Sequence, residues 1–181
     1  MAGLAGLVAG AAALSGCKSL DTTPNVGPCP VAATLYDFER QVEIKGEERH
    51  SNVGFTGQVE HVRGFCRYVD DDPITMEVDI DFALGRGPAA EGTEKTYTYF
   101  VAVTRKDNSV LVKKTYPLKV SFKKGQEVLR MREKVEGIEI PRATPTISGA
   151  NFEILVGFEL TPEQLEFNRA GKRFRMQVEE E

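Results

Sequence analysis

The densest group of acidic side chains in the sequence is Asp70-Asp71-Asp72, which is followed directly by Pro73. Neighbouring carboxylates supply the several oxygen ligands that Ca²⁺ prefers, so Asp70, Asp71 and Asp72 form a candidate metal site. A turn between strands is the alternative, because Asp followed by Pro is common in turns and the glycine of a calcium-binding loop does not follow. We favour the turn.

A second set of carboxylates, Glu77, Asp79 and Asp81, alternates with apolar residues. Two carboxyl groups that flank a sugar bond are the usual requirement for glycoside hydrolysis, so these residues are candidates for that reaction. Their spacing of two, however, places all three on one outward face of a strand, with no sign of a cleft. A solvated strand face is the favoured interpretation.

Histidine chemistry has few possible anchors, since the 181 residues include only His50 and His61. His61 continues the apolar phase of Val59, so we expect it in the core or at a strand edge. The motifs G-x-S-x-G and H-E-x-x-H and a phosphate-binding glycine loop do not occur in the sequence. These observations favour a protein that is not an enzyme and uses no cofactor.

The N-terminus is an uncharged apolar stretch that ends in Leu14-Ser15-Gly16-Cys17. It is too short to span a bilayer as a helix, which takes about 20 residues. These four residues resemble the lipobox of bacterial lipoproteins, in which the Cys thiol takes a diacylglycerol and the signal is cut before that Cys. The resemblance implies lipidation of Cys17, although no Lys or Arg precedes Lys18, as a secretion signal normally requires. A buried apolar helix with Cys17 as a core thiol is the alternative, which the many Gly and Ala residues disfavour.

Assigning Cys17 to lipid leaves Cys29 and Cys66 as a pair among the three cysteines. A disulfide between them fits an oxidising compartment. It would close a loop of about 38 residues and stabilise the fold by roughly 4 kcal/mol in the chain-entropy model. Two free buried thiols are the alternative.

Alternation of period two dominates the rest of the chain, and it is clearest from Ile74 to Leu84. The alternation that starts at Val53 slips near Arg63-Gly64, where we expect a β-bulge. Further strands are expected near 31–44, 96–104, 110–112, 116–122, 126–140 and 152–160. About seven strands with turns between them predict an all-β fold, an antiparallel β-sandwich of immunoglobulin-like architecture. A small β-barrel is the alternative.

One short helix is expected near the C-terminus, because Thr161-Pro162-Glu163-Gln164 supplies an N-cap, a first-turn proline and a capping-box Gln. The helix should end near Gly171. The chain then divides into a signal peptide at 1–16, a lipidated tether at 17–28, a β-sandwich domain at 29–171 and a charged tail at 172–181.

The formal net charge of −4, with basic residues dispersed along the chain, excludes the concentrated positive field of a nucleic-acid binder. One stretch is locally basic. We expect its lysines to protect an edge strand from pairing with another chain, with anionic headgroups or an acidic partner as the alternative. They are Lys113, Lys114, Lys119, Lys123 and Lys124.

The segments Arg86-Gly87-Pro88, 99–103 and 156–162, with Cys29-Pro30, resemble an uncharacterised lipoprotein family of alphaproteobacteria. The resemblance implies a Gram-negative envelope and transfers no functional residue. In many Gram-negative lipoproteins an Asp after the lipidated Cys resembles a signal for retention in the inner membrane. This chain has Lys18-Ser19 at that place, so we expect it in the outer membrane, facing the periplasm. We expect a non-enzymatic binding or assembly module with two partners, the membrane through lipid on Cys17 and an envelope protein. A glycan-binding protein or glycan-active enzyme is the alternative.

Overall fold

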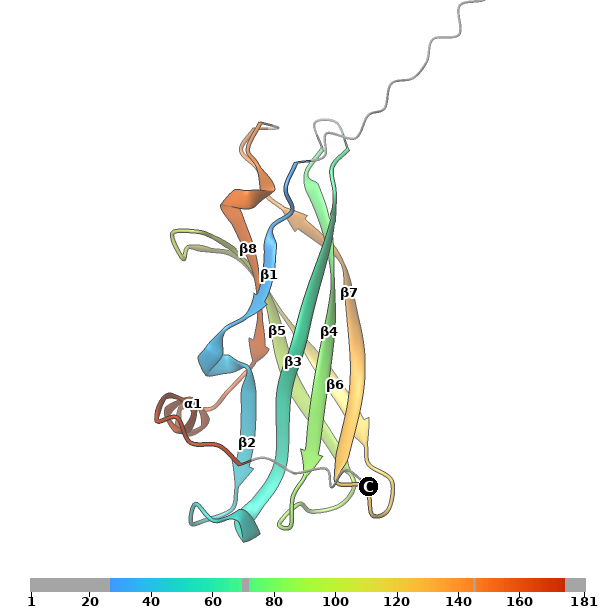
Figure 1. Ribbon diagram of the computed structural model, residues 1–181, viewed down its shortest axis with the longest axis vertical. Helices are drawn as coiled ribbons and strands as arrows, with labels where there is room; N and C mark the ends of the chain where they lie inside the picture. The colour runs from blue at the N-terminus through green and yellow to red at the C-terminus, as the bar shows by residue number, and fades with distance from the viewer. Residues whose placement is uncertain (1–26, 70–71, 145, 175–181) are drawn as a thin grey trace, which may run out of the picture.

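The computed structural model describes residues 27–69, 72–144 and 146–174 (Figure 1). The predicted signal peptide, the predicted lipidation site Cys17 and the predicted tail beyond Phe174 lie outside the described residues. So do Asp70 and Asp71 of the acidic cluster. The tether is described only from Gly27 onward.

Two four-stranded sheets pack face to face and confirm the predicted β-sandwich. In order across the first sheet, the strands are β1 (Val31–Thr34), β8 (Phe152–Phe158), β5 (Glu94–Arg105) and β6 (Val110–Ser121). The second sheet consists of β2 (Arg40–Ile44), β3 (Val53–Arg67), β4 (Ile74–Arg86) and β7 (Val128–Ile140).

All the described strand pairs are antiparallel except β1 with β8, which is parallel. Eight strands are described where about seven were expected. The architecture is that of immunoglobulin-like sandwiches, whereas the strand order differs from the ABED and CFG sheets of an immunoglobulin constant domain. Short 3-10 turns at Tyr36–Phe38, His50–Asn52 and Gly149–Asn151 complete the connections.

The core lies between the two sheets and follows the predicted alternation. Every second side chain of β4 from Ile74 to Leu84 is at most 2% exposed. Phe82 contacts the rings of Tyr99 and Phe158, with centroids 5.2 and 5.6 Å away. Each such side chain contributes about 1.5–3 kcal/mol on burial, so this strand is central to the stability of the domain.

The bulge in β3 lies at Glu60, between the paired residues Val59 and His61, so its predicted position at Arg63-Gly64 is wrong. The extra residue reverses the phase of the alternation from that point. His61 consequently points outward with its side chain 71% exposed. Of its two expected places, the core is wrong, and the residue lies on β3 beyond Gln58, the last residue paired with β2. The reason is that register depends on pairing with β4, which the local pattern of β3 does not encode.

The helix α1 (Pro162–Arg169) begins with the predicted capping box, in which Thr161 and Gln164 bond each other's backbone N–H groups. It docks on the outer face of β2, where Phe167 packs against Val42 and Val53. Asn168 is 5% exposed, and its amide donates hydrogen bonds to the carbonyls of Asp37 and Arg40 at 2.7 and 2.8 Å. These contacts hold the segment after the helix beside the sheet.

Candidate functional site

Cys29 and Cys66 form the predicted disulfide, with their Cα atoms 5.6 Å apart. The bond joins the segment before β1 to the last residues of β3. It lies at the end of the domain where the described chain begins, which we call the tether end (Figure 1). The bond therefore couples the segment before β1 covalently to the second sheet.

Tyr68 reinforces the tether end from inside. Its side chain is 6% exposed, and its hydroxyl donates to the Pro28 carbonyl at 2.7 Å while accepting from the Gly149 amide at 2.8 Å. One buried phenol thus joins three separate segments of the chain next to the disulfide. Buried polar groups that are satisfied in this way hold a single geometry.

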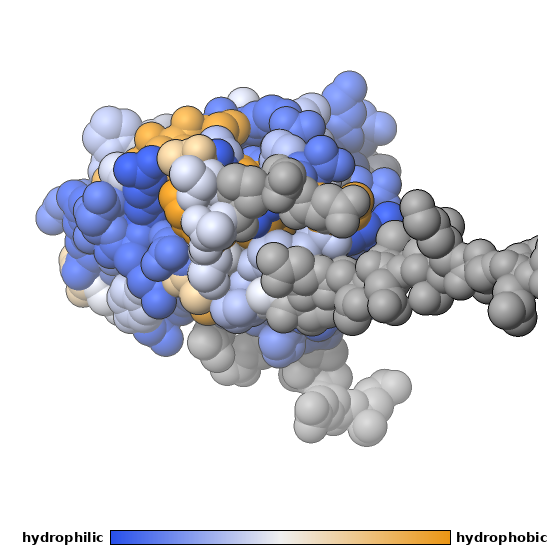
Figure 2. Space-filling model, turned by 90° about the horizontal axis from the view of Figure 1, so that it is seen from above, coloured by the Kyte–Doolittle hydropathy of each residue, from blue (hydrophilic) through white to orange (hydrophobic). Residues whose placement is uncertain are grey.

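Several large apolar side chains stay exposed at the tether end. Val31 is 60% exposed, Phe65 51%, Val69 45% and Val110 61%. Sheet register places Val110 at the level of Val31, across β8 and β5. Figure 2 looks onto this end and shows apolar surface in orange between hydrophilic areas. Two strands, β8 and β5, separate Val31 from Val110, and Phe65 belongs to the other sheet, so these are separate apolar positions at one end of the domain.

Of the acidic cluster only Asp72 is described, and it lies at the same end. The Asp72 amide donates to the Val69 carbonyl at 2.9 Å, and Arg142 donates to the Asp72 carbonyl. The first bond lies between β3 and β4, where the sequence predicts a turn. No cluster of three or more metal-ligating side chains occurs within residues 27–69, 72–144 and 146–174. A calcium site that uses Asp70 and Asp71 stays a prediction.

Glu77, Asp79 and Asp81 point outward from β4, but ion pairs neutralise the residues that glycoside hydrolysis would use. Asp81 accepts hydrogen bonds from Arg132 at 2.6 Å and Arg63 at 2.7 Å. These bonds, that of Arg132 first, lower the pKa of Asp81 to about 2. Glu77 pairs with Lys134 at 3.1 Å. A general acid needs a raised pKa, so this charged strand face suits solvation rather than sugar-bond cleavage.

The long edge strands carry features that oppose pairing with another chain. The Phe122 amide donates to the Thr93 carbonyl at 2.8 Å, so even-numbered residues of this segment bond to β5. In an antiparallel pair the residues between them, here the odd-numbered residues of β6, direct their N–H and C=O groups away from β5, toward the open edge. Pro117, which has no N–H, and the flanking lysines occupy that outward edge. On β7 the edge is bent by a bulge at Gly137, whose φ is +68°. Lys113, Lys114 and Lys119 therefore lie on an edge strand, as predicted, whereas Lys123 and Lys124 lie in the connection after β6.

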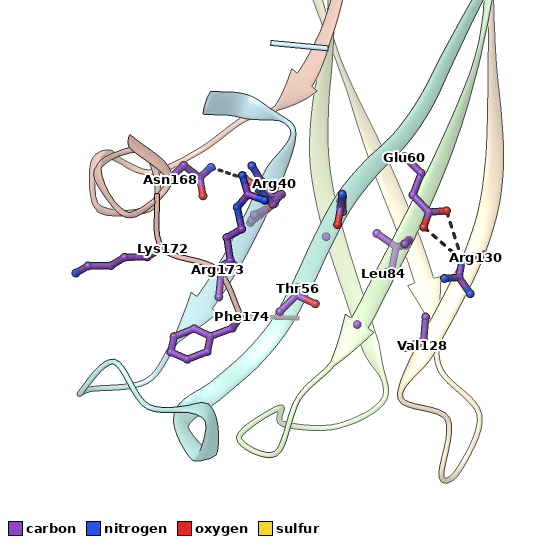
Figure 3. Close-up of a pocket in the computed structure, with 16 residues that line it drawn as sticks. Arg40, Thr56, Glu60, Leu84, Val128, Arg130, Asn168, Lys172, Arg173 and Phe174 are labelled. Atoms are coloured by element: carbon purple, nitrogen blue, oxygen red, sulfur yellow. Dashed lines mark hydrogen bonds and ion pairs between the residues drawn. The ribbon is translucent and has the colours of Figure 1, made fainter. Parts of the chain in front are cut away.

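A hollow of about 370 Å³ lies on the outer face of the second sheet, in the half of the domain away from the disulfide (Figure 3). Its floor is made of short side chains, and α1 with the segment after it forms one wall. We call it the basic hollow, lined by Arg40, Gln41, Val42, Thr56, Gly57, Gln58, Glu60, Ala83, Leu84, Gly85, Val128, Arg130, Asn168, Lys172, Arg173 and Phe174.

Charge in the basic hollow is unbalanced, since four cationic side chains and one carboxylate line it. The carboxylate, Glu60, forms an ion pair with Arg130 on the rim, with an N–O distance of 3.4 Å. Arg40 is 8% exposed and pairs with Glu39 at 2.7 Å, outside the lining. Arg173 donates to the neutral Tyr36 hydroxyl at 2.6 Å. Lys172 pairs with Glu48 at 2.6 Å, also outside the lining. The lining thus has a formal excess of three positive charges, two of which are paired with the flanking carboxylates Glu39 and Glu48.

Sequence reasoning missed the basic hollow because its residues come from four strands and the segment after the helix. One local signal was present. The outward positions of β4 change from carboxylates at Glu77, Asp79 and Asp81 to small residues at Ala83 and Gly85. Small outward residues leave space on a sheet surface, which a neighbouring element then encloses.

Comparisons of the chain with protein-family models, with curated proteins and with solved structures found no match. The resemblance to an alphaproteobacterial lipoprotein family therefore stays a prediction. Within the described residues, no helix has the length and apolar character needed to cross a membrane.

Proposed function

We propose that the protein is a lipid-anchored envelope protein of a Gram-negative bacterium and that its β-sandwich is a non-enzymatic binding module. The observation that carries the binding role is the basic hollow, a concave site of about 370 Å³ with excess positive charge. Its lining contains neither His nor Cys, and its one carboxylate, Glu60, is paired with Arg130. These residues suit the retention of a ligand better than its chemical conversion.

The position of the disulfide supports the anchoring role. The tether from Cys17 to Cys29 spans 12 residues, which reach at most about 40 Å when extended. An anchor on Cys17 would keep the tether end near the bilayer, where the exposed apolar side chains Val31, Phe65 and Val69 could contact lipid or an envelope protein. The basic hollow, in the opposite half of the domain, would then face away from the membrane.

Fractionation of the native host tests the anchor. The Cys17→Ala variant is expected to leave the membrane fraction, because a diacylglyceryl group supplies the buried CH₂ groups that hold the chain. A matched control is the double variant Cys29→Ala/Cys66→Ala, which keeps Cys17 and should stay with the outer membrane. Retention of the Cys17→Ala protein in the membrane would refute the anchoring role.

A further inference from the structure

The basic hollow combines positive charge, neutral polar groups and an apolar wall. We propose that it binds an anionic carbohydrate, a sugar that carries a carboxylate or a phosphate. The proposal rests on the binding role of the domain and assigns a class of ligand to its concave site.

The charge of the site selects an anion. The whole chain has a formal net charge of −4, whereas the lining of the basic hollow has a formal excess of three positive charges. Glu39 and Glu48 flank two of these cations, Arg40 and Lys172, and Arg173 bonds the neutral Tyr36 hydroxyl. The guanidinium groups of Arg40, Arg130 and Arg173 have planar forks that match carboxylate and phosphate oxygens. Arg130 lies on the rim with its side chain 61% exposed, and a ligand anion would compete with Glu60, 3.4 Å away, for its guanidinium group.

The uncharged lining residues select a carbohydrate. Thr56 and Gln58 on β3 present hydroxyl and amide groups, which can bond sugar hydroxyls as donors and acceptors. Phe174 forms an apolar wall and stacks on Phe167, with centroids 5.8 Å apart. The C–H face of a sugar ring packs well on such a surface. A volume near 370 Å³ lies at the small end of ligand sites and fits a monosaccharide unit.

The site is held in shape before a ligand arrives. Tyr97 crosses from the first sheet and donates to the Thr56 carbonyl at 2.8 Å, and burial raises the pKa of this phenol above its usual range. The two hydrogen bonds of Asn168 fix the wall after α1. Arg40 stacks on the Tyr36 ring, with its guanidinium carbon 5.3 Å from the centroid. Preorganised groups lose less entropy on binding.

Calorimetric titration of the full chain with three sugars tests the proposal. Galacturonic acid supplies a carboxylate, galactose 6-phosphate supplies a phosphate, and galactose is the neutral control. We expect at least one of the anionic sugars to bind at least tenfold more tightly than galactose, and the better of the two identifies the anionic group. The affinity should fall with added salt, since the charges are partly exposed.

Two variants and one control locate the binding. Arg130→Gln removes a cation, and Ala83→Leu fills the floor without changing the charge. Each should weaken binding at least tenfold. Arg132→Gln is the matched control, because Arg132 lies two residues further along β7 with a similarly exposed side chain but contacts Asp81 outside the hollow. It should bind as the unmodified chain does.

Several results would overturn the assignment. Equal affinity for galactose and the anionic sugars would refute the charge selection, and an equal loss in Arg132→Gln would refute the location. If no sugar binds while Cys17→Ala is released from the membrane, the ligand class fails and the anchoring role stands.

Discussion

The hydroxyl of Tyr68 donates a hydrogen bond to the carbonyl of Pro28, one residue before the disulfide, at 2.7 Å. The same oxygen accepts from Gly149 at 2.8 Å. Tyr68→Phe would leave both backbone groups without this partner, so the free energy of unfolding should fall by about 1–3 kcal/mol. Urea denaturation measures it. Tyr36→Phe, at a 57% exposed side chain, is the control and should change stability by less than about 0.5 kcal/mol.

The disulfide should contribute more than any single hydrogen bond. It closes a loop with a sequence separation of 37 residues. The chain-entropy model predicts a loss of about 4 kcal/mol in the free energy of unfolding for Cys29→Ala/Cys66→Ala. Reducing agent should destabilise the unmodified domain and leave the double variant unchanged. If the unmodified protein with its disulfide intact and the double variant were equally stable without reducing agent, this expectation would be contradicted.

Asp81 should make stability depend on pH in acid. Its pKa is lowered from 3.8 to about 2 in the folded chain, chiefly by the hydrogen bond from Arg132. A lowered folded-state pKa stabilises the fold above the unfolded-state value, and this contribution is lost as pH falls from about 4 to 2. Carboxyl titration by NMR should give a midpoint near 2, which rises in Arg132→Gln. A midpoint near 3.8 in the unmodified chain would contradict the ion-paired geometry.

The edge of β6 should resist self-association because of its lysines and its proline. Replacing Lys113, Pro117 and Lys119 with Thr would restore the one N–H group that Pro117 lacks and remove two positive charges from the outward edge. Light scattering should then show larger species at high protein concentration than for the unmodified chain. Lys106→Thr in the adjacent turn is the control. An unchanged mass for the triple variant would show that other features protect this edge.

Core residues are predicted best from the sequence where one face of a strand is buried along its whole length. In β4 the alternation from Ile74 to Leu84 identifies the core, because each inward position meets the opposite sheet. The disulfide was predictable as well, since lipidation of Cys17 would leave only Cys29 and Cys66. Both inferences depend on residue type and position alone.

Features that depend on pairing between distant segments escaped prediction. The bulge at Glu60 moves His61 out of the core, and it is visible only once β3 is aligned with β4. The basic hollow joins Arg40, Arg130 and Arg173, which are far apart in the chain and belong to no motif. Its enclosure depends on where α1 docks, a tertiary packing preference that no local pattern specifies.

The most direct test of the account is the mass of the N-terminal peptide from protein purified out of the envelope. If the protein is a lipid-anchored binding module, that peptide begins at Cys17 and carries the added mass of a diacylglyceryl group, with or without a third acyl chain. A peptide that retains the residues before an unmodified Cys17 would contradict the anchor and the orientation derived from it.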